Sequence, residues 1–527
     1  MDNEINIKSL AWDIISVISG YIIFCGITVI KSVSSFHIAA PFFYAKYTSF
    51  PYPNWFIYIS IGFCFYLLIF LLFNPFRRSS EIYGGAHWAQ SREIKKFGLY
   101  EKQGVILGEK FGKYIRTDAP LSTLVYAPPG TGKTAGIIIP SLLSCDNSVI
   151  AHDPKSELFE KTSKYRAGFS RIIKFSPGDS DSAKWNPLSK KELPEEWPDI
   201  EKIVSQIAHS FFTSEKNKED SMWVREARSM FIFWALFLIA TNGETSFPEI
   251  FKKSLTLDEA PDLQSVIALE IEEKKEILPD RVTLEGNALI AKAEREFSGV
   301  LGTYKSYMNI FSDSRVAKNL SRSDFSLKDL RKEKTSIYLT VKNADQTRLK
   351  PILTLFFEAA TLAALDHEPK PDEESITLFI DEFVRLGRMK EVLEMSAIGR
   401  SYRINAVFVC QSISQLIDIY SKEGADKLKN TCAYHCIFTQ NEAQIARDIS
   451  ESIGKKTRKR KSKSKQATKF FGSVQEGQEG IPLILPQEIM SLPKDKVLIL
   501  VQNNFQTPIL AKPALWFQDK TLSKFII

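Results

Sequence analysis

The stretch LVYAPPGTGKTAGIIIPSLL, residues 124–143, joins a short apolar run to a helical pattern through a turn of prolines and glycines. The turn contains most of a phosphate-binding loop, G-x-x-x-x-G-K-[ST], but Ala127 occupies the position of the first glycine. Because Pro128 and Pro129 have no N–H, we expect the N–H groups that bind phosphate to begin at Gly130, where a helix N-terminus adds partial positive charge. The alanine matters only if its position requires a positive φ.

Five residues of this turn are candidates for binding ATP and Mg²⁺, namely Gly130, Thr131, Gly132, Lys133 and Thr134. Backbone N–H groups would surround the phosphates, the lysine would reach the β and γ phosphates, and the Thr134 hydroxyl would be a metal ligand. The alternative is a structural glycine turn between a strand and a helix. A second motif in the chain favours the nucleotide site.

The segment SITLFIDEF, residues 375–383, is an apolar run of strand length that ends in two adjacent carboxylates. At the carboxyl end of a buried parallel strand, Asp381 would contact the metal ion and Glu382 would polarise the attacking water. Taken alone, the pair could be an ordinary solvated acidic pair. Together with the phosphate-binding loop, it predicts an ATPase site.

The spacing of the two motifs predicts a large insertion. Lys133 and Asp381 are 248 residues apart, whereas one strand–helix unit of a doubly wound sheet needs only about 30 residues. Strand-like runs at 147–152 and 171–175 follow the loop, and another at 335–341 precedes Asp381. We therefore expect an α/β sheet that is interrupted by a separate domain.

The inserted region, from about residue 190 to 325, has a mainly helical pattern. Within it, residues 222–240 are strongly apolar but carry Arg225, Glu226 and Arg228 near their start. The uncharged part is too short to cross a bilayer comfortably, so we predict a buried helix. The insert is expected to be an all-α domain.

Two N-terminal segments, 14–30 and 55–73, carry no charge. At about 1.5 Å per residue each helix would reach roughly 25 to 29 Å, near the thickness of a hydrocarbon core, which predicts a two-helix transmembrane hairpin. Three acidic residues against one lysine before the first segment argue against a cleaved signal peptide. Arg77 and Arg78 favour a cytoplasmic location for the rest of the chain, as does its need for ATP, although two lysines between the segments oppose this orientation.

The 527 residues, of which 44% are apolar and 25% charged, suffice for a two-part globular body beyond the anchor. The net charge of +7 is concentrated in the run KKTRKRKSKSKQATK, residues 455–469, where nine of fifteen residues are Lys or Arg. Such a run is usually a disordered solvated loop, or it contacts phosphates. It has no aromatic residue for base stacking.

No zinc site is expected at CAYHC, 432–436, because a fourth ligand is missing.

A series of short motifs resembles the TraG/VirD-type coupling proteins of type IV secretion systems, in the order found in that family. The series covers nearly the whole chain and includes YGGAHWAQ (83–90), the phosphate-binding loop, HDPKSEL (152–158), IDEFVRLGR (380–388), VCQSISQL (409–416) and PLILPQEIMSLP (482–493). The resemblance implies a RecA-like P-loop NTPase with a doubly wound sheet, an inserted all-α domain and an N-terminal anchor of two transmembrane helices. It implies a homo-hexamer in the bacterial inner membrane, with ATP and Mg²⁺ as cofactors.

The resemblance also implies roles for two further residues. Gln411, after the strand-like run AVFVC, matches a polar residue that senses the γ-phosphate; the alternative is a solvent-facing glutamine at a helix start. Arg400, 19 residues after Asp381, matches an arginine finger that enters a neighbouring subunit's site, and Arg403 is the competing candidate. Glu382, Arg400 and Gln411 are thus the expected catalytic residues.

The resemblance implies a division of the chain into four parts. These are an anchor at 1–80, a first nucleotide-binding part at 81–190, the all-α insert at 191–325 and a second nucleotide-binding part at 326–527. The implied partners are the secretion channel and either DNA with its relaxase or effector proteins. Some relatives carry a long tail that recruits effectors, whereas this chain stops soon after TPILAKPALWF, 507–517, so recruitment would fall to the insert. The alternatives are a receptor that uses nucleotide only to hold a ring, and a membrane-anchored DNA pump of the chromosome-partitioning type.

Overall fold

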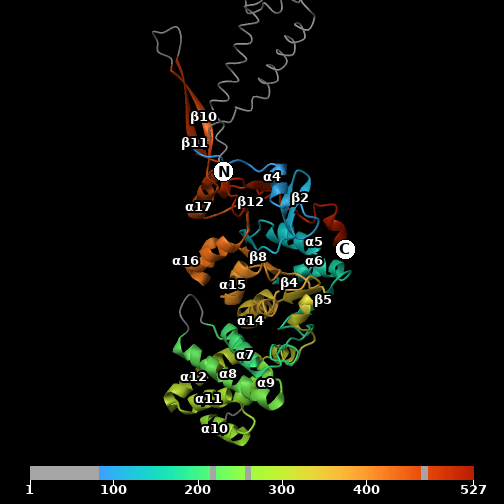
Figure 1. Ribbon diagram of the computed structural model, residues 1–527, viewed down its shortest axis with the longest axis vertical. Helices are drawn as coiled ribbons and strands as arrows, with labels where there is room; N and C mark the ends of the chain where they lie inside the picture. Colours follow the sequence, from blue (N-terminus) through green and yellow to red (C-terminus); the bar gives the residue numbers. More distant parts are fainter. Residues whose placement is uncertain (1–81, 214–220, 256–262, 465–472, 527) are drawn as a thin grey trace, which may run out of the picture. The chain divides into compact units, whose positions relative to one another are not determined.

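The computed structural model describes residues 82–213, 221–255, 263–464 and 473–526 (Figure 1). The predicted transmembrane segments lie outside these residues, and the described residues belong to one unit, Ile82–Ile527. No single described helix has both the length and the hydropathy to cross a bilayer. Two consecutive helices, Met222–Asn242 and Phe247–Leu255, meet that test only as a pair bent by 108°.

A nine-stranded sheet forms the centre of the nucleotide-binding part. Its strand order is β13-β12-β9-β3-β8-β7-β4-β6-β5. All neighbours from β9 to β5 are parallel, while β12 is antiparallel to both β9 and β13. In the order of the sheet, the strands are Ile509–Ala511, Val497–Val501, Tyr434–Ile437, Thr123–Tyr126, Ile404–Cys410, Ile376–Ile380, Ser148–Asp153, Thr335–Thr340 and Arg171–Phe175. The five strand-like runs are confirmed as β4, β5, β6, β7 and β8.

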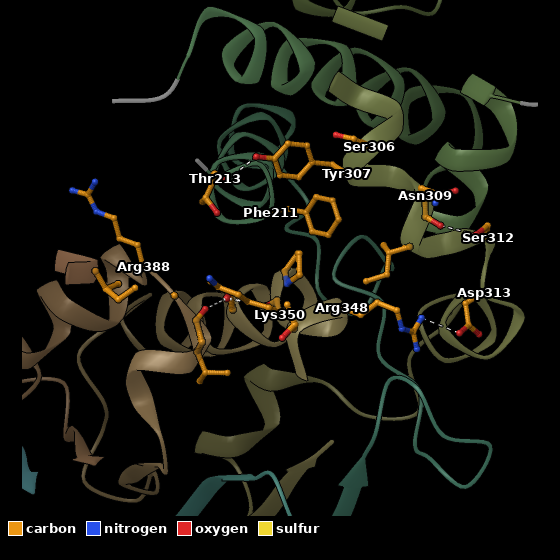
Figure 2. A pocket seen from close by; sticks show the side chains of 17 residues that line it. Phe211, Thr213, Ser306, Tyr307, Asn309, Ser312, Asp313, Arg348, Lys350 and Arg388 are labelled. Atoms are coloured by element: carbon orange, nitrogen blue, oxygen red, sulfur yellow. Dashed lines mark hydrogen bonds and ion pairs between the residues drawn. The ribbon is translucent and has the colours of Figure 1, made fainter. Parts of the chain in front are cut away.

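An insert of helices separates β5 from β6, as predicted. Residues of α8 from Phe231 to Ile239 are all buried, which confirms a buried helix in this region. The Ser221 side chain accepts a hydrogen bond from the Val224 N–H at the start of α8, and Gly243 ends the helix at φ +83°. A cavity lies between the insert and α14 (Figure 2). The helices are α7 (Trp197–Phe211), α8 (Met222–Asn242), α9 (Phe247–Leu255), α10 (Leu263–Lys274), α11 (Asp280–Ile290), α12 (Glu294–Met308) and α13 (Ser314–Asn319).

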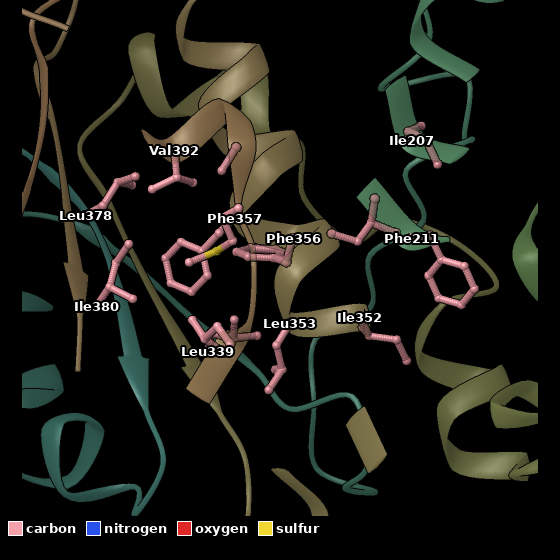
Figure 3. Packing of buried hydrophobic residues seen from close by; sticks show 14 of the residues in the cluster. Ile207, Phe211, Leu339, Ile352, Leu353, Phe356, Phe357, Leu378, Ile380 and Val392 are labelled. Atoms are coloured by element: carbon pink, nitrogen blue, oxygen red, sulfur yellow. The ribbon is translucent and has the colours of Figure 1, made fainter. Parts of the chain in front are cut away.

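Alternate side chains of the strands enter two separate hydrophobic cores, one on each face of the sheet. Leu378 and Ile380 belong to one core, with Phe356 and Phe357 of α14, and Phe379 belongs to the other (Figure 3). A sheet buried on both faces explains why these strands read as continuous apolar runs, and it confirms the doubly wound α/β class. The covering helices are α5 (Ile139–Ser144) and α6 (Glu157–Arg166) on one face and α14 (Gln346–Ala364), α15 (Lys390–Ile398) and α16 (Ile413–Thr431) on the other.

The first ten residues of the basic run form a strand, so the expectation of a disordered loop is wrong there. Strand β10, Lys455–Ser464, pairs antiparallel with β11, Ser473–Pro482. At the base of this hairpin the Ala86 N–H donates to the Lys455 carbonyl at 3.1 Å. Gly84 has φ +139°, and an added Cβ there would lie 2.3 Å from the Lys455 oxygen. Backbone pairing satisfies the polar main chain of the hairpin, and composition alone does not reveal such distant partners.

The remaining α-helices and strands precede β3 or follow β9 in the chain. They are α4 (Ser91–Lys96), β1 (Val105–Lys110), β2 (Lys113–Thr117), α17 (Ala443–Ile453) and α18 (Pro486–Met490). Strands β1 and β2 form a separate antiparallel pair beside the second core. Neither this pair nor the hairpin β10–β11 belongs to the nine-stranded sheet.

Candidate functional site

The phosphate-binding loop follows β3 and has the backbone that its glycines permit. Gly130 and Gly132 have φ of +75° and +84°, a conformation that other residues adopt only with strain. The Thr131 hydroxyl donates to the Pro128 carbonyl at 2.8 Å and closes the turn. Within the described chain, the backbone N–H groups from Gly130 to Thr134 donate no hydrogen bond, so they remain available to an anion.

Ala127 fits its position without strain. Its N–H donates to the Cys410 carbonyl at 3.0 Å, which extends the pairing of β3 with β8. Its side chain is fully buried, and Ala127 is not one of the residues with positive φ. The alanine is therefore compatible with the loop, because the position does not need a glycine.

Asp381 brings the two motifs together. Strands β3, β8 and β7 are consecutive in the sheet, so their carboxyl ends meet. The Thr134 hydroxyl donates to Asp381 Oδ2 at 3.1 Å, and Lys133 Nζ lies 3.5 Å from Asp381 Oδ1. The lysine and aspartate side chains are only 12% and 9% exposed. This cluster is the arrangement that the two motifs predict for ATP and Mg²⁺.

The cluster fits both cofactor groups. Adjacent ligands of an octahedral Mg²⁺ are about 2.9 Å apart when the bonds are near 2.05 Å, and the Thr134 and Asp381 oxygens are 3.1 Å apart. Lys133 Nζ is buried and, among the described residues, has no hydrogen-bond partner. A buried ammonium with unused donors suits a phosphate.

Glu382 lies beside the cluster in a conformation unusual for its type, with φ 54° and ψ 43°. Its carboxylate forms an ion pair with Arg385 Nε at 2.9 Å. Arg385 Nη1 also donates to the Gln346 side chain at the start of α14, at 3.0 Å. In this conformation the proposed base is therefore paired with an arginine that itself contacts α14.

His152 is a buried neighbour that sequence reasoning gave no role. It is the penultimate residue of β4, and its Nδ1 hydrogen-bonds to the Asp381 carbonyl. Burial lowers the pKa of His152, which favours the neutral imidazole, and its Nε2 is buried without a partner among the described residues. The histidine helps to hold the turn that carries Asp381 and Glu382. Its motif HDPKSEL was noted only as part of the family resemblance.

Gln411 and Arg400 lie at opposite ends of β8. Gln411 directly follows Cys410, so it lies at the same end of the sheet as the loop. Arg400 precedes β8 and is exposed. Because β8 has seven residues, its ends are roughly 20 Å apart at about 3.3 Å per residue. Within one subunit the structure brings Gln411, but not Arg400, to the end of the sheet that carries the loop.

Arg403 has side-chain contacts that Arg400 lacks within the part of the chain that the structure describes. Its guanidinium donates to the Lys370 carbonyl, and its own carbonyl accepts from the Ile376 N–H at 3.0 Å. Its φ is +45°. These contacts join the chain before β8 to the start of β7, and they favour Arg400 as the residue available to another subunit.

A C-terminal segment packs on the helix that follows the loop. The Ala514 N–H donates to the Gly136 carbonyl at 3.2 Å, and the Trp516 N–H donates to the Ala135 carbonyl at 3.1 Å. A Cβ added at Gly132 would lie 3.5 Å from Leu515 Cδ2. The sequence did not predict this packing of 513–516 on the helix, because no local pattern in 513–516 indicates a contact with residues so distant in the chain.

Comparison with known proteins gives a consistent result. A family model described as type IV secretory system conjugative DNA transfer matches residues 87–526. Protein VirD4 of Agrobacterium fabrum is 29% identical over 464 residues, which cover 85% of this chain and 68% of the relative. The conjugal transfer protein TraG of Escherichia coli is 25% identical over 474 residues, covering 80% and 73%.

Solved structures show the same fold. The plasmid coupling protein TrwB in complex with ADP and Mg²⁺ superposes with a TM-score of 0.61 at 17% identity, covering 82% of this chain and 96% of that protein. A likeness at this identity establishes the α/β architecture of the nucleotide-binding part and its insert.

Proposed function

The chain belongs to the type IV secretory system conjugative DNA transfer family, and from this we propose that it is the coupling ATPase of such a system. In this role it recruits DNA–relaxase complexes or effector proteins and drives them into a secretion channel by ATP hydrolysis. The observation that carries the proposal is the meeting of Lys133, Thr134 and Asp381 at the ends of adjacent strands. The names of the relatives, VirD4 and TraG, supply the process.

Each residue of the site has a proposed task. The N–H groups of Gly130, Thr131 and Gly132 bind the phosphates, and Lys133 neutralises their charge. Thr134 and Asp381 hold Mg²⁺, which when bound stabilises charge on the phosphate oxygens. Once its ion pair with Arg385 is broken, Glu382 orients and deprotonates the attacking water. Gln411 contacts the γ-phosphate.

We propose that segments 14–30 and 55–73 anchor the protein in the inner membrane, with residues 81–527 in the cytoplasm as two nucleotide-binding parts and an insert. The support is their uncharged length. In membranes washed at alkaline pH, the full chain should stay in the pellet, whereas a chain that starts at Ile82 should not. Recovery of both in the supernatant would contradict the anchor.

We propose a homo-hexamer in which Arg400 enters the site of the neighbouring subunit. The support is the exposed position of Arg400 at the end of β8 that is remote from its own loop. An arginine so placed can stabilise transition-state charge only across a subunit interface.

ATP turnover of the full chain, measured with and without single-stranded DNA, tests the motor function. We expect DNA to raise turnover several-fold, with Lys133→Ala as the inactive control. A receptor that uses nucleotide only to hold a ring would show no DNA-dependent turnover. The presence of secretion-channel genes beside this one would separate a coupling ATPase from a chromosome-partitioning pump.

The hairpin β10–β11 is the proposed contact with DNA phosphates. Serine in place of the lysines and arginines from Lys455 to Lys469 should weaken DNA binding and flatten its salt dependence. Each lost phosphate contact removes about 0.7 from the slope of log K against log salt on single strands. A filter-binding titration at several salt concentrations measures this slope, and an unchanged slope would show that the run is only solvated.

A further inference from the structure

A cavity of about 570 Å³ lies between the helical insert and the nucleotide-binding part (Figure 2). We call it the seam cavity. The end of α7, the end of α12 and the 3-10 turn that follows it, Asn309–Ser312, form the insert side. The start of α14, residues 386–388 and Ile419 of α16 form the other side. Its volume is in the range of pockets that bind small molecules or short peptide segments.

Two cations of the seam cavity have no counter-charge among the residues that the structure describes. Arg348 is paired with Asp313 at 2.9 Å and with Asp345 at 3.1 Å. Lys350 and Arg388 form no ion pair or side-chain hydrogen bond with any other described residue. Asp313 is the single acidic residue among the described lining residues, and Arg348 already neutralises it. Within the described part of the chain, Lys350 and the exposed Arg388 are therefore two unpaired positive charges of the lining.

Lys350 lies close against the backbone at Gly387. Gly387 has φ +85°, and a Cβ added there would lie 2.5 Å from Lys350 Cε and 3.0 Å from Nζ. The glycine therefore leaves room for the end of the lysine side chain beside residues 386–388 of the lining.

The apolar part of the lining decides between possible anions. Phe211 is buried among Phe212, Phe247 and Phe311, and the Tyr307 hydroxyl donates to the Thr213 carbonyl at 2.6 Å. Neither ring is free to stack on a base, which single-strand binding sites normally require. A peptide can instead place an aliphatic side chain against the apolar wall formed by Ile310, Pro351, Leu386 and Ile419.

We propose that the seam cavity binds a short acidic peptide segment of a protein substrate, with its carboxylates on Lys350 and Arg388 and a neighbouring aliphatic side chain on the apolar wall. The proposal rests on the proposed function, because it identifies the chemistry by which a coupling ATPase recognises cargo. The bound segment must carry carboxylates and aliphatic groups together, since the described lining offers both unpaired cations and an apolar surface.

The position of the cavity connects a bound segment to the catalytic turn. Arg388 is six residues after Glu382 in the chain. The Arg385 side chain pairs with Glu382 and donates to Gln346, four residues before Lys350 on α14. A segment that draws Lys350 and Arg388 together therefore acts on both elements that hold Arg385 against Glu382.

The test uses the full chain in lipid nanodiscs and a short fluorescent peptide of alternating glutamate and leucine, with binding measured by anisotropy. We expect Lys350→Ala/Arg388→Ala to weaken binding about tenfold or more, because two charge-assisted contacts are lost. Lys305→Ala is the matched control, since Lys305 is exposed on α12 outside the lining, and it should bind normally. A glutamine–leucine peptide should bind the wild type at least tenfold more weakly.

Charge reversal guards against a misfolded variant. Lys350→Glu/Arg388→Glu should lose the glutamate peptide and gain binding of a lysine–leucine peptide of the same length. Undiminished glutamate-peptide binding by the alanine variant, or equal affinity of the glutamine peptide, would overturn the proposal. Binding of a labelled oligothymidylate is measured in parallel. If the alanine variant loses only oligothymidylate binding and keeps peptide binding, the cavity is a DNA site and the proposal is overturned. Basal ATP turnover, expected to be unchanged in the alanine variant, shows separately whether the proposed function holds.

Discussion

Glu382→Gln should bind ATP with nearly normal affinity and lose about 10²- to 10⁴-fold in turnover. The amide has the size of the carboxylate but cannot accept a proton, and general-base catalysis contributes about this factor. Lys133→Ala should instead lose nucleotide binding itself, because it removes the buried ammonium beside Asp381. Binding of a fluorescent ATP analogue and steady-state phosphate release measure the two effects.

The ion pair of Glu382 calls for its own control. The glutamine variant also breaks the contact with Arg385, and Arg385→Gln breaks the same contact while it keeps the glutamate. If Glu382 is the base, Arg385→Gln should retain turnover or raise it. Glu394→Gln on α15, which breaks an exposed pair with Lys427 of α16, is the matched control for a change of charge. Normal turnover of Glu382→Gln would remove the residue from its role.

Arg400→Ala should keep near-normal ATP affinity and lose on the order of 10³-fold in turnover. A finger acts mainly on charge that develops in the transition state, so ground-state binding changes little. Arg400 lies roughly 20 Å from its own loop by the length of β8, so as a finger it is expected to act on a neighbouring subunit. Co-expressed and co-purified chains that carry Arg400→Ala and Lys133→Ala should recover part of the activity.

The recovery has a geometric cause. One kind of mixed interface pairs an intact loop from one parent with an intact arginine from the other, which neither homomeric ring contains. Arg403→Ala distinguishes the roles of the two arginines. It removes the contact with the Lys370 carbonyl, so it should lower the melting temperature and leave the turnover of the folded protein nearly unchanged. Co-purified mixtures that stay as inactive as both parents would show that the arginine does not act in trans.

Local patterns determined much of the site. The phosphate-binding loop was predictable because its residue types have few other uses at that spacing, and Gly130 and Gly132 have the positive φ that the motif requires. The strand before Asp381 was predictable because burial on both faces makes a run continuously apolar. The buried helix in the insert followed from its length and its charged residues.

Pairings between distant segments were not predictable from such patterns. The strand order that places β8 between β3 and β7 depends on which buried faces fit together. The basic run became β10 because Ser473–Pro482 and Gly84–Ala86 pair with its backbone, and its composition says nothing of these partners. The contact of Glu382 with Arg385 depends on a positive φ that a glutamate rarely adopts.

The sequence by itself determined the strands of the buried sheet core, the buried helix of the insert and which residue types could bind phosphate and metal, because apolar runs, helical periodicity and the loop's chemistry are properties of neighbouring residues. Only the tertiary structure decided that Asp381 meets Lys133 and Thr134 across 248 residues and that Ala514–Trp516 packs on the helix after the loop. It also decided that Lys350 and Arg388 line one cavity without a counter-charge among the described residues. These contacts arise from burial and hydrogen bonding between segments far apart in the chain, which no local pattern specifies.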